Sequence, residues 1–176
     1  MGSGFQESSE VDPARRVFVS YIDKSREFYL AQGFGNPYRW AYHTDVPFTP
    51  LPKPLAECRL GLVTTASEWT GEQPKDLIDR PPKSPYARPV EPPPERMYTM
   101  DLSWDKEATH TDDTESFLPI RRLKEWESLG RIGSLSPRFY GVPTEYSQRK
   151  TREIDAPRIL EYCRADGVDV ALLVPL

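Results

Sequence analysis

The feature that most limits what this chain can fold into is its proline content. The sequence has 19 prolines in 176 residues, and eight of them fall between Pro74 and Pro94. Proline lacks a backbone N–H and fixes φ, so neither a helix nor a central strand tolerates that density. We therefore expect residues 74–94 to form a surface loop or wrapping arm without regular structure. A second proline-rich stretch, residues 37–58, is typical of an extended connector.

Composition and charge exclude several classes of protein. The net charge is −4, so there is no basic excess for general binding to nucleic-acid phosphates. No apolar run approaches a membrane span, and Met1–Gly4 has no hydrophobic signal region, which predicts a cytoplasmic protein that does not contact membranes. The two cysteines, Cys58 and Cys163, lie far apart and form no CxxC pair. A disulfide framework and a cysteine-rich zinc site are therefore excluded, and no metal is expected.

Hydrophobic periodicity predicts three helices and three strands. The first helix has Asp12 as its N-cap and ends at Gly33, and the second opens at Pro119 and ends at Gly130. The third is capped by Asp155 and ends at Gly167. The second helix is expected to bury Leu123, Trp126 and Leu129, and the third Ile159, Leu160 and Cys163. The predicted strands are residues 60–65, 132–136 and 168–174, and the last is expected to be continuously buried. Residues 97–104 are expected to be extended, and residues 109–114 to form a turn.

The order strand, helix, strand, helix, strand predicts an α/β fold, a Rossmann-like parallel sheet flanked by helices. Three parts are expected: an N-terminal helical segment over residues 1–36, the connector over 37–58, and an α/β domain over 59–176 that contains the proline-rich loop. A buried parallel strand normally leads into a crossover helix, whereas here the chain stops. We therefore expect a domain that is incomplete at its C-terminus. Such a domain would expose an apolar patch and would be poorly soluble or associate with another chain.

Parallel sheets place their sites at the carboxyl ends of their strands, which draws attention to Thr64 and Thr65. Their hydroxyls could donate hydrogen bonds to an anionic substrate, or could satisfy local backbone groups, which is the commoner role. No glycine-rich phosphate loop follows them, so a dinucleotide cofactor is not expected. The sequence also lacks a GxSxG motif and a serine or cysteine beside a histidine.

The densest polar group near a predicted helix start is formed by His110, Asp112 and Asp113. A carboxylate can orient an imidazole and raise its pKa, which would give an acid/base pair near neutral pH. The same residues could bind a metal ion. The alternative, which the short pattern somewhat favours, is a solvated turn that caps the following helix. If the group is functional, His110 and Asp112 should face the carboxyl ends of the strands.

Six segments follow one another in an order that carries family information. They are residues 47–55, 60–66, 110–113, 117–123, 130–132 and 167–173. Together they resemble the glycine/sarcosine/betaine/D-proline reductase family, especially its D-proline reductase selenoprotein branch. The resemblance extends over roughly residues 42–176.

This resemblance implies a reductase subunit that cleaves the C–N bond of a small amino acid or amine. In the family a selenolate or thiolate attacks the carbon that bears the amino group and releases the amine. Partner subunits, some with a pyruvoyl group, activate the substrate, and a dithiol or thioredoxin-type donor restores the enzyme. The reactive selenocysteine or cysteine follows the strand that matches residues 168–174. The resemblance thus implies a nucleophile after Leu176, no catalytic residue or cofactor within this chain, and Thr64, Thr65, His110, Asp112 and Asp113 as candidate pocket residues.

Three functions follow from these observations. Selenocysteine is encoded by UGA, which ordinary gene prediction reads as a stop, so the first is a selenoprotein reading frame cut at that codon. The second is a non-catalytic α/β module that binds a partner or a small ligand. The third, a metal-dependent acid/base enzyme using His110, Asp112 and Asp113, is the weakest because only one histidine is nearby.

Overall fold

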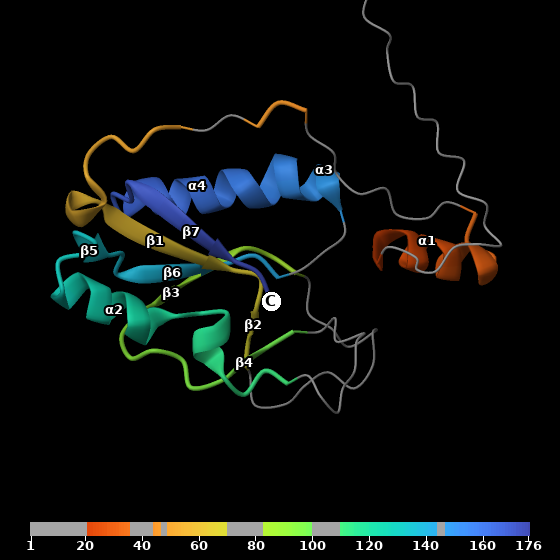
Figure 1. Ribbon diagram of the computed structural model, residues 1–176, viewed down its shortest axis with the longest axis horizontal. Helices are drawn as coiled ribbons and strands as arrows, with labels where there is room; N and C mark the ends of the chain where they lie inside the picture. Colours follow the sequence, from red (N-terminus) through yellow and green to blue (C-terminus); the bar gives the residue numbers. More distant parts are fainter. Residues whose placement is uncertain (1–20, 36–43, 47–48, 70–82, 100–109, 144–146) are drawn as a thin grey trace, which may run out of the picture. The chain divides into compact units, whose positions relative to one another are not determined.

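The computed structural model describes residues 21–35, 44–46, 49–69, 83–99, 110–143 and 147–176, which fall into two compact units (Figure 1). The units are residues 1–44 and 45–176. In the first unit, helix α1 (Tyr21–Ala31) is followed by Gly33 with φ of 86°, the left-handed conformation that ends helices. The predicted end of this helix at Gly33 is confirmed. Its predicted start at Asp12 lies outside the described residues.

The second unit is built on a five-stranded sheet around strand β1. The strands of this sheet are β1 (Arg59–Thr64), β3 (Tyr86–Pro89), β5 (Ser134–Leu135), β6 (Arg138–Gly141) and β7 (Val170–Val174). Strand β7 pairs with β1 in parallel along one side. On the other side, β5 pairs with the beginning of β1 and β6 with its end, both in parallel. Strand β3 adds to β6 in the antiparallel sense, so the fold is α/β with a mixed sheet.

Two proline positions modify the predicted strands. The predicted strand over residues 132–136 begins two residues later, as β5, and Pro137, which has no N–H for the ladder, separates β5 from β6. The prediction that residues 74–94 lack regular structure is wrong for Tyr86–Pro89, because these residues form β3. Pro89 is tolerated there because β3 lies at the edge of the sheet. Residues 74–82 lie outside the described ranges.

The remaining short elements surround the sheet. A separate two-stranded antiparallel pair is formed by β2 (Ser67–Glu68) and β4 (Met97–Tyr98). Single 3-10 turns are η2 (Leu55–Glu57) and η4 (Thr114–Ser116). The extended segment predicted over residues 97–104 is thus seen in β4, and its last five residues lie outside the described part of the chain.

Helix α2 (Ile120–Ser128) begins directly after Pro119 and ends before Gly130, close to the prediction. Its inward face is formed by Ile120 and Leu123 and not, as expected, by Leu123, Trp126 and Leu129. A helix turns about 100° per residue, so three residues fall about 60° short of a full turn. The three such steps from Ile120 to Leu129 add up to about half a turn. Leu129 therefore points away from the face that carries Ile120 and is 61% exposed.

The third predicted helix begins earlier than expected. Helical structure starts with α3 (Gln148–Lys150), passes through a π-helical turn, η5 (Thr151–Asp155), and continues as α4 (Ala156–Ala165). Ser147 is the N-cap, whereas Asp155 is buried, helical and makes no capping bond. Pro157 cannot donate to the carbonyl four residues earlier, so a widened turn at this point is physically reasonable. The predicted end at Gly167 is confirmed, but Leu160 is half-exposed and not part of the inward face.

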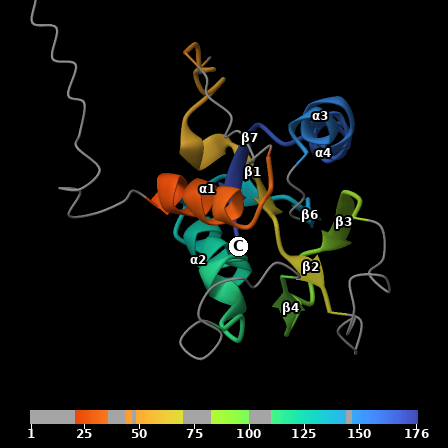
Figure 2. The same cartoon turned by 90° about the vertical axis from the view of Figure 1, so that its right-hand side faces the viewer.

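The core forms two layers, one on each face of the sheet, and Figure 2 shows α2 and α4 on opposite faces. On the α2 side, Leu60 and Leu62 of β1 pack with apolar residues that include Phe117, Ile120 and Leu123. On the α4 side, Val63, Tyr140 and Cys163 form a smaller cluster. The predicted helical cover of both faces is confirmed.

Strand β7 is not the continuously buried strand expected from its sequence. Its only strand partner in the described part of the chain is β1, and Leu172 and Leu173 are 38% and 71% exposed. The buried cluster below α4 is formed with residues of β1 and β6. Leu172 and Leu173 therefore give β7 an exposed apolar surface.

The close approach of Tyr86 to Gly141 gives a test of the sheet. A Cβ on Gly141 would lie 1.9 Å from Tyr86 Cζ, whereas a Cβ on Gly35 would meet nothing within 4 Å. We expect Gly141→Ala to lower the free energy of unfolding by about 1–3 kcal/mol, as overpacking does. Gly35→Ala, the control, should leave it nearly unchanged. Urea denaturation measures both, and equal stability of the two variants would contradict the packing described.

Candidate functional site

The carboxyl end of β1 is occupied by two hydroxyls that bond to backbone groups. Thr64 is buried, and its Oγ1 accepts the N–H of Ala66 at 3.3 Å. Thr65 Oγ1 accepts the N–H of Leu176 at 2.8 Å and donates to the carbonyl oxygen of Leu176 at 3.1 Å. Of the two roles considered for these threonines, the structure shows the satisfaction of backbone groups. Their role as pocket residues stays a prediction.

The group around His110 has the geometry of a solvated turn. His110 Nδ1 lies 3.5 Å from Asp112 Oδ2, and the side chains are 65% and 80% exposed. The N–H of Asp112 donates to the same Nδ1 at 3.4 Å. Asp113 Oδ1 accepts the N–H of Glu115 at 3.1 Å and thereby caps η4. Asp113 therefore has a capping role, although it caps η4 and not the helix predicted to open at Pro119.

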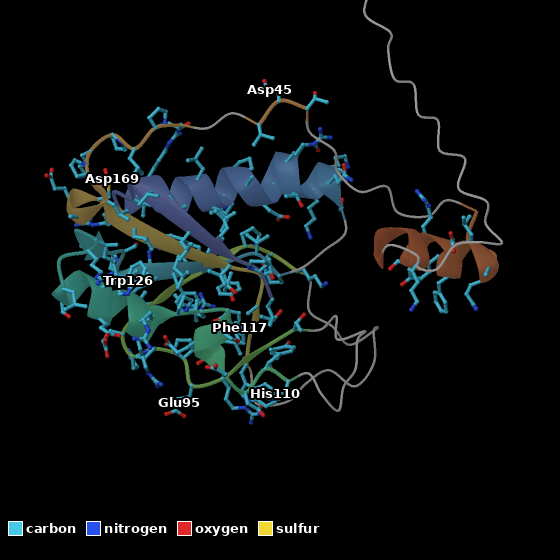
Figure 3. All side chains as sticks on the ribbon, viewed as in Figure 1. Asp45, Glu95, His110, Phe117, Trp126 and Asp169 are labelled. Carbon is cyan, nitrogen blue, oxygen red and sulfur yellow. The ribbon has the colours of Figure 1, made fainter. Side chains whose placement is uncertain are left out.

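The two sets of predicted residues do not meet. In Figure 3, His110 lies apart from the carboxyl ends of β1 and β7. The expectation that His110 and Asp112 face those strand ends is therefore not met. The reason lies in the order of the elements along the chain. The turn with His110 and η4 come after β4, which pairs with β2, and do not come directly after β1 or β7. Within the described ranges, no group of three His, Cys, Asp or Glu side chains is arranged to hold a metal ion.

A shallow depression of about 440 Å³ lies at the beginning of α2. Its lining residues are Asp113, Glu115, Ser116, Pro119, Arg121, Arg122 and Glu125. The Glu115 carboxylate accepts the N–H groups of Arg121 and Arg122 at 3.0 and 3.2 Å, and the Arg122 guanidinium pairs with Glu125. The N-terminus of α2 is thus capped by the Glu115 carboxylate, and the Arg122 guanidinium in the depression is paired with Glu125.

A polar network near the amino ends of β6 and β7 was not predicted from the sequence. The Arg138 guanidinium donates two hydrogen bonds to the Asp166 carboxylate, both 2.9 Å long. The Tyr140 hydroxyl donates to the same carboxylate at 2.7 Å and lies 2.9 Å from Ser136 Oγ. Alternate residues of a strand share a face, so the spacing of Arg138 and Tyr140 could have indicated a shared partner. Asp166 itself, just before Gly167, gave no such signal.

The hydrogen bonds of this network favour the charged form of the Asp166 carboxylate. Burial alone would raise the pKa of Asp166, but the hydrogen bonds from Arg138 and Tyr140 outweigh it, and the pKa is lowered. Burial is the main cause of the raised pKa of Tyr140. The pKa of Asp169, at the amino end of β7 (Figure 3), is lowered by the backbone N–H of Arg59 and by Lys53.

Neither cysteine is an exposed, reactive thiol. Cys58 is fully buried, and its Sγ donates to the Lys53 carbonyl at 3.4 Å. Cys163 is buried on the inward face of α4, as predicted, and burial raises the pKa of its thiol. A raised thiol pKa leaves less thiolate at neutral pH and so disfavours nucleophilic chemistry at Cys163.

Comparisons of this chain with known protein families, curated proteins and solved structures gave no match. The reductase resemblance therefore rests on the six sequence segments alone. None of the helices in the described part of the chain combines the length and the apolar character needed to cross a bilayer.

The Asp166 network generates a pH-dependent prediction. A carboxyl group with a lowered pKa in the folded state stabilises it above its unfolded pKa of about 3.9, and this contribution is lost as the pH falls through the folded pKa. We expect Asp166→Asn to lower the free energy of unfolding at pH 7 by about 1–3 kcal/mol. The difference from the unsubstituted chain should shrink below about pH 4.

Denaturation in urea between pH 2.5 and 7 measures this effect. Glu161→Gln is the control, because Glu161 is exposed and its ion pair with Arg158 lies on the surface of α4. A difference between the Asp166→Asn variant and the unsubstituted chain that stays constant over the whole pH range would contradict the assigned role.

Proposed function

We propose that this chain forms the α/β scaffold of a selenol- or thiol-dependent reductase subunit that cleaves the C–N bond of a small amino acid or amine in the cytoplasm. The order of the six sequence segments along the chain supports membership of the reductase family. The observation that carries the proposal is the position of β7, the strand that the resemblance sets directly before the nucleophile. It runs parallel to β1 and ends beside Thr65 at the carboxyl edge of the sheet, where α/β proteins bind their substrates.

The buried cysteines support a nucleophile other than Cys58 and Cys163. In the proposed reaction a selenolate or thiolate attacks the carbon that bears the amino group, and the C–N bond electrons leave with the amine, which takes up a proton. A thiol then attacks the selenium or sulfur, and the carbon is released with a proton from the medium. The second thiol of a dithiol or thioredoxin-type donor completes a disulfide. Overall, one C–N bond and two thiols are converted into one C–H bond, one N–H bond and one disulfide.

Other reductase subunits, including one with a pyruvoyl group, are proposed as partners that activate the substrate. A primary or secondary amine is a poor leaving group, so attachment to an electrophilic carbonyl on a partner would ease the cleavage. This chain would then supply the sheet against which the nucleophile is held. His110 and Asp112 are exposed and lie apart from the strand ends, so Thr64 and Thr65 are the residues that we keep as proposed pocket residues.

The DNA that follows codon 176 tests the proposal. We expect an in-frame TGA followed by a reading frame that encodes a Cys- and His-containing helix. The extended protein, made with selenocysteine or with cysteine at that codon, should release ammonia or amine from glycine, sarcosine or betaine, or open the ring of D-proline to a linear amino acid, when a dithiol and partner subunits are supplied. The 176-residue chain should not. A different stop codon, or an extended protein without this activity, would contradict the proposal.

In the same assay, His110→Ala should leave kcat/KM nearly unchanged, because the imidazole is 65% exposed in a turn that lies apart from the strand ends. Glu127→Ala, at an exposed position of α2, is the control. A loss of kcat/KM in His110→Ala but not in Glu127→Ala would contradict the turn role of His110.

A second candidate function is a non-catalytic interaction module, and the exposed edge of β7 favours it. At the other edge of the sheet, β3 carries Arg88 and Pro89, which discourage the addition of a further strand. Strand β7, with the sequence Val-Ala-Leu-Leu-Val, has neither a charge nor a proline. An apolar, unprotected edge strand is typical of a surface that associates with another chain.

Substitution of an exposed leucine distinguishes this function. If β7 mediates association, sedimentation of the 176-residue chain should depend on its concentration, and Leu173→Lys should abolish that dependence. Leu129→Lys is the control, because Leu129 is similarly exposed on α2. A chain that stays monomeric at all concentrations and binds no partner through β7 would contradict the interaction function.

A further inference from the structure

We propose that Thr65 is a positioning residue that holds the main chain at Leu176 against the carboxyl end of β1 and so sets the direction in which the polypeptide leaves β7. The effect of Thr65 on catalysis rests on the proposed reductase function, whereas its hydrogen bonds to Leu176 are observed independently of that function. A single hydroxyl, Thr65 Oγ1, both accepts the N–H of Leu176 and donates to the carbonyl of the same residue, at 2.8 and 3.1 Å.

The position of this hydroxyl explains why a side chain is needed there. The backbone register of β1 and β7 ends at the pair Thr64 and Val174. Beyond it, β1 turns away into β2, and the next residue of β7, Pro175, has no N–H to donate. Thr65 thus substitutes with its side chain for a ladder bond that the backbone no longer provides.

The chemistry of the two bonds limits which residue can act here. The N–H of Leu176 needs an acceptor and its carbonyl needs a donor, and a hydroxyl is both at once. A carboxylate would lack the donor, and a methyl group would lack both functions. Thr65 is half-buried, so the loss of its hydroxyl would not be fully compensated by water.

The consequence concerns the carboxyl edge, where the proposed nucleophile would act. A reactive group is effective only when its direction is fixed within a narrow range, since misplacement by about 1 Å is costly in rate. The backbone at Leu176 has no strand neighbour of its own among the described residues. The Leu176 side chain packs against the core, and the Thr65 hydroxyl supplies the hydrogen bonds that orient its main chain.

Amide hydrogen exchange of the ¹⁵N-labelled 176-residue chain tests the two hydrogen bonds between the Thr65 hydroxyl and Leu176. Thr65→Val, which keeps the side-chain shape, should speed the exchange of the Leu176 amide roughly tenfold, as loss of two hydrogen bonds predicts. Thr65→Ser, which keeps the hydroxyl, should restore slow exchange. Thr64→Val is the matched control, because Thr64 bonds to Ala66 and not to Leu176. Unchanged exchange at Leu176 in Thr65→Val would overturn the proposal, whatever the activity of the protein.

The extended reductase supplies the second readout. Thr65→Val should lower kcat roughly tenfold or more with KM little changed, and Thr65→Ser should recover most of the activity. An active extended enzyme whose kcat is insensitive to Thr65→Val would overturn the catalytic consequence while leaving the reductase function intact. An inactive extended protein that still shows the exchange effect would overturn the reductase function and would still support the role of Thr65 in holding the main chain at Leu176.

Discussion

Parallel pairing of β1 with β7 is the interaction on which the second unit depends, because it joins the first and the last strands of the sheet. The pairing is fastened at both ends. At the amino end, the Arg59 N–H donates to Asp169 Oδ2 and the Asp169 N–H donates to the Arg59 carbonyl, at 2.8 and 2.9 Å. At the carboxyl end, the Thr65 hydroxyl takes over. Backbone hydrogen bonds contribute little each, so such end contacts decide whether a five-residue edge strand stays in place.

The sequence was sufficient for the features that depend on local chemistry. Continuous apolar runs identified β1 and β7, and glycine after a polar turn identified the ends of α1, α2 and α4, where Gly33, Gly130 and Gly167 adopt positive φ. Periodicity could not show which part of an apolar strand is covered. Val170–Val174 has the composition of a buried strand, yet its exposure depends on where α4 packs, which is a tertiary property.

The candidate site was predicted only in part, for a related reason. Thr64 and Thr65 follow from the position of strand ends, which sequence can indicate. Their separation from His110 depends on the β2–β4 pair, whose two-residue strands give no periodic signal. The Asp166 network was missed because its members come from two segments, residues 136–140 and Asp166, that meet only in the folded sheet. The helix end at Asp166 and the short strand β6 look ordinary in isolation.

The long sequence separations within the sheet have a consequence for how this protein folds. The contact between Arg59 and Ser134 spans 75 residues, and the contact between Arg59 and Asp169 spans 110. During synthesis, β1 emerges from the ribosome well before either of its neighbours exists. Loop closure over such distances is slow, so the apolar strand stays unpaired for a long interval and invites non-native contacts. A chain of this topology is therefore expected to fold slowly and to depend on chaperones for its yield in the cell.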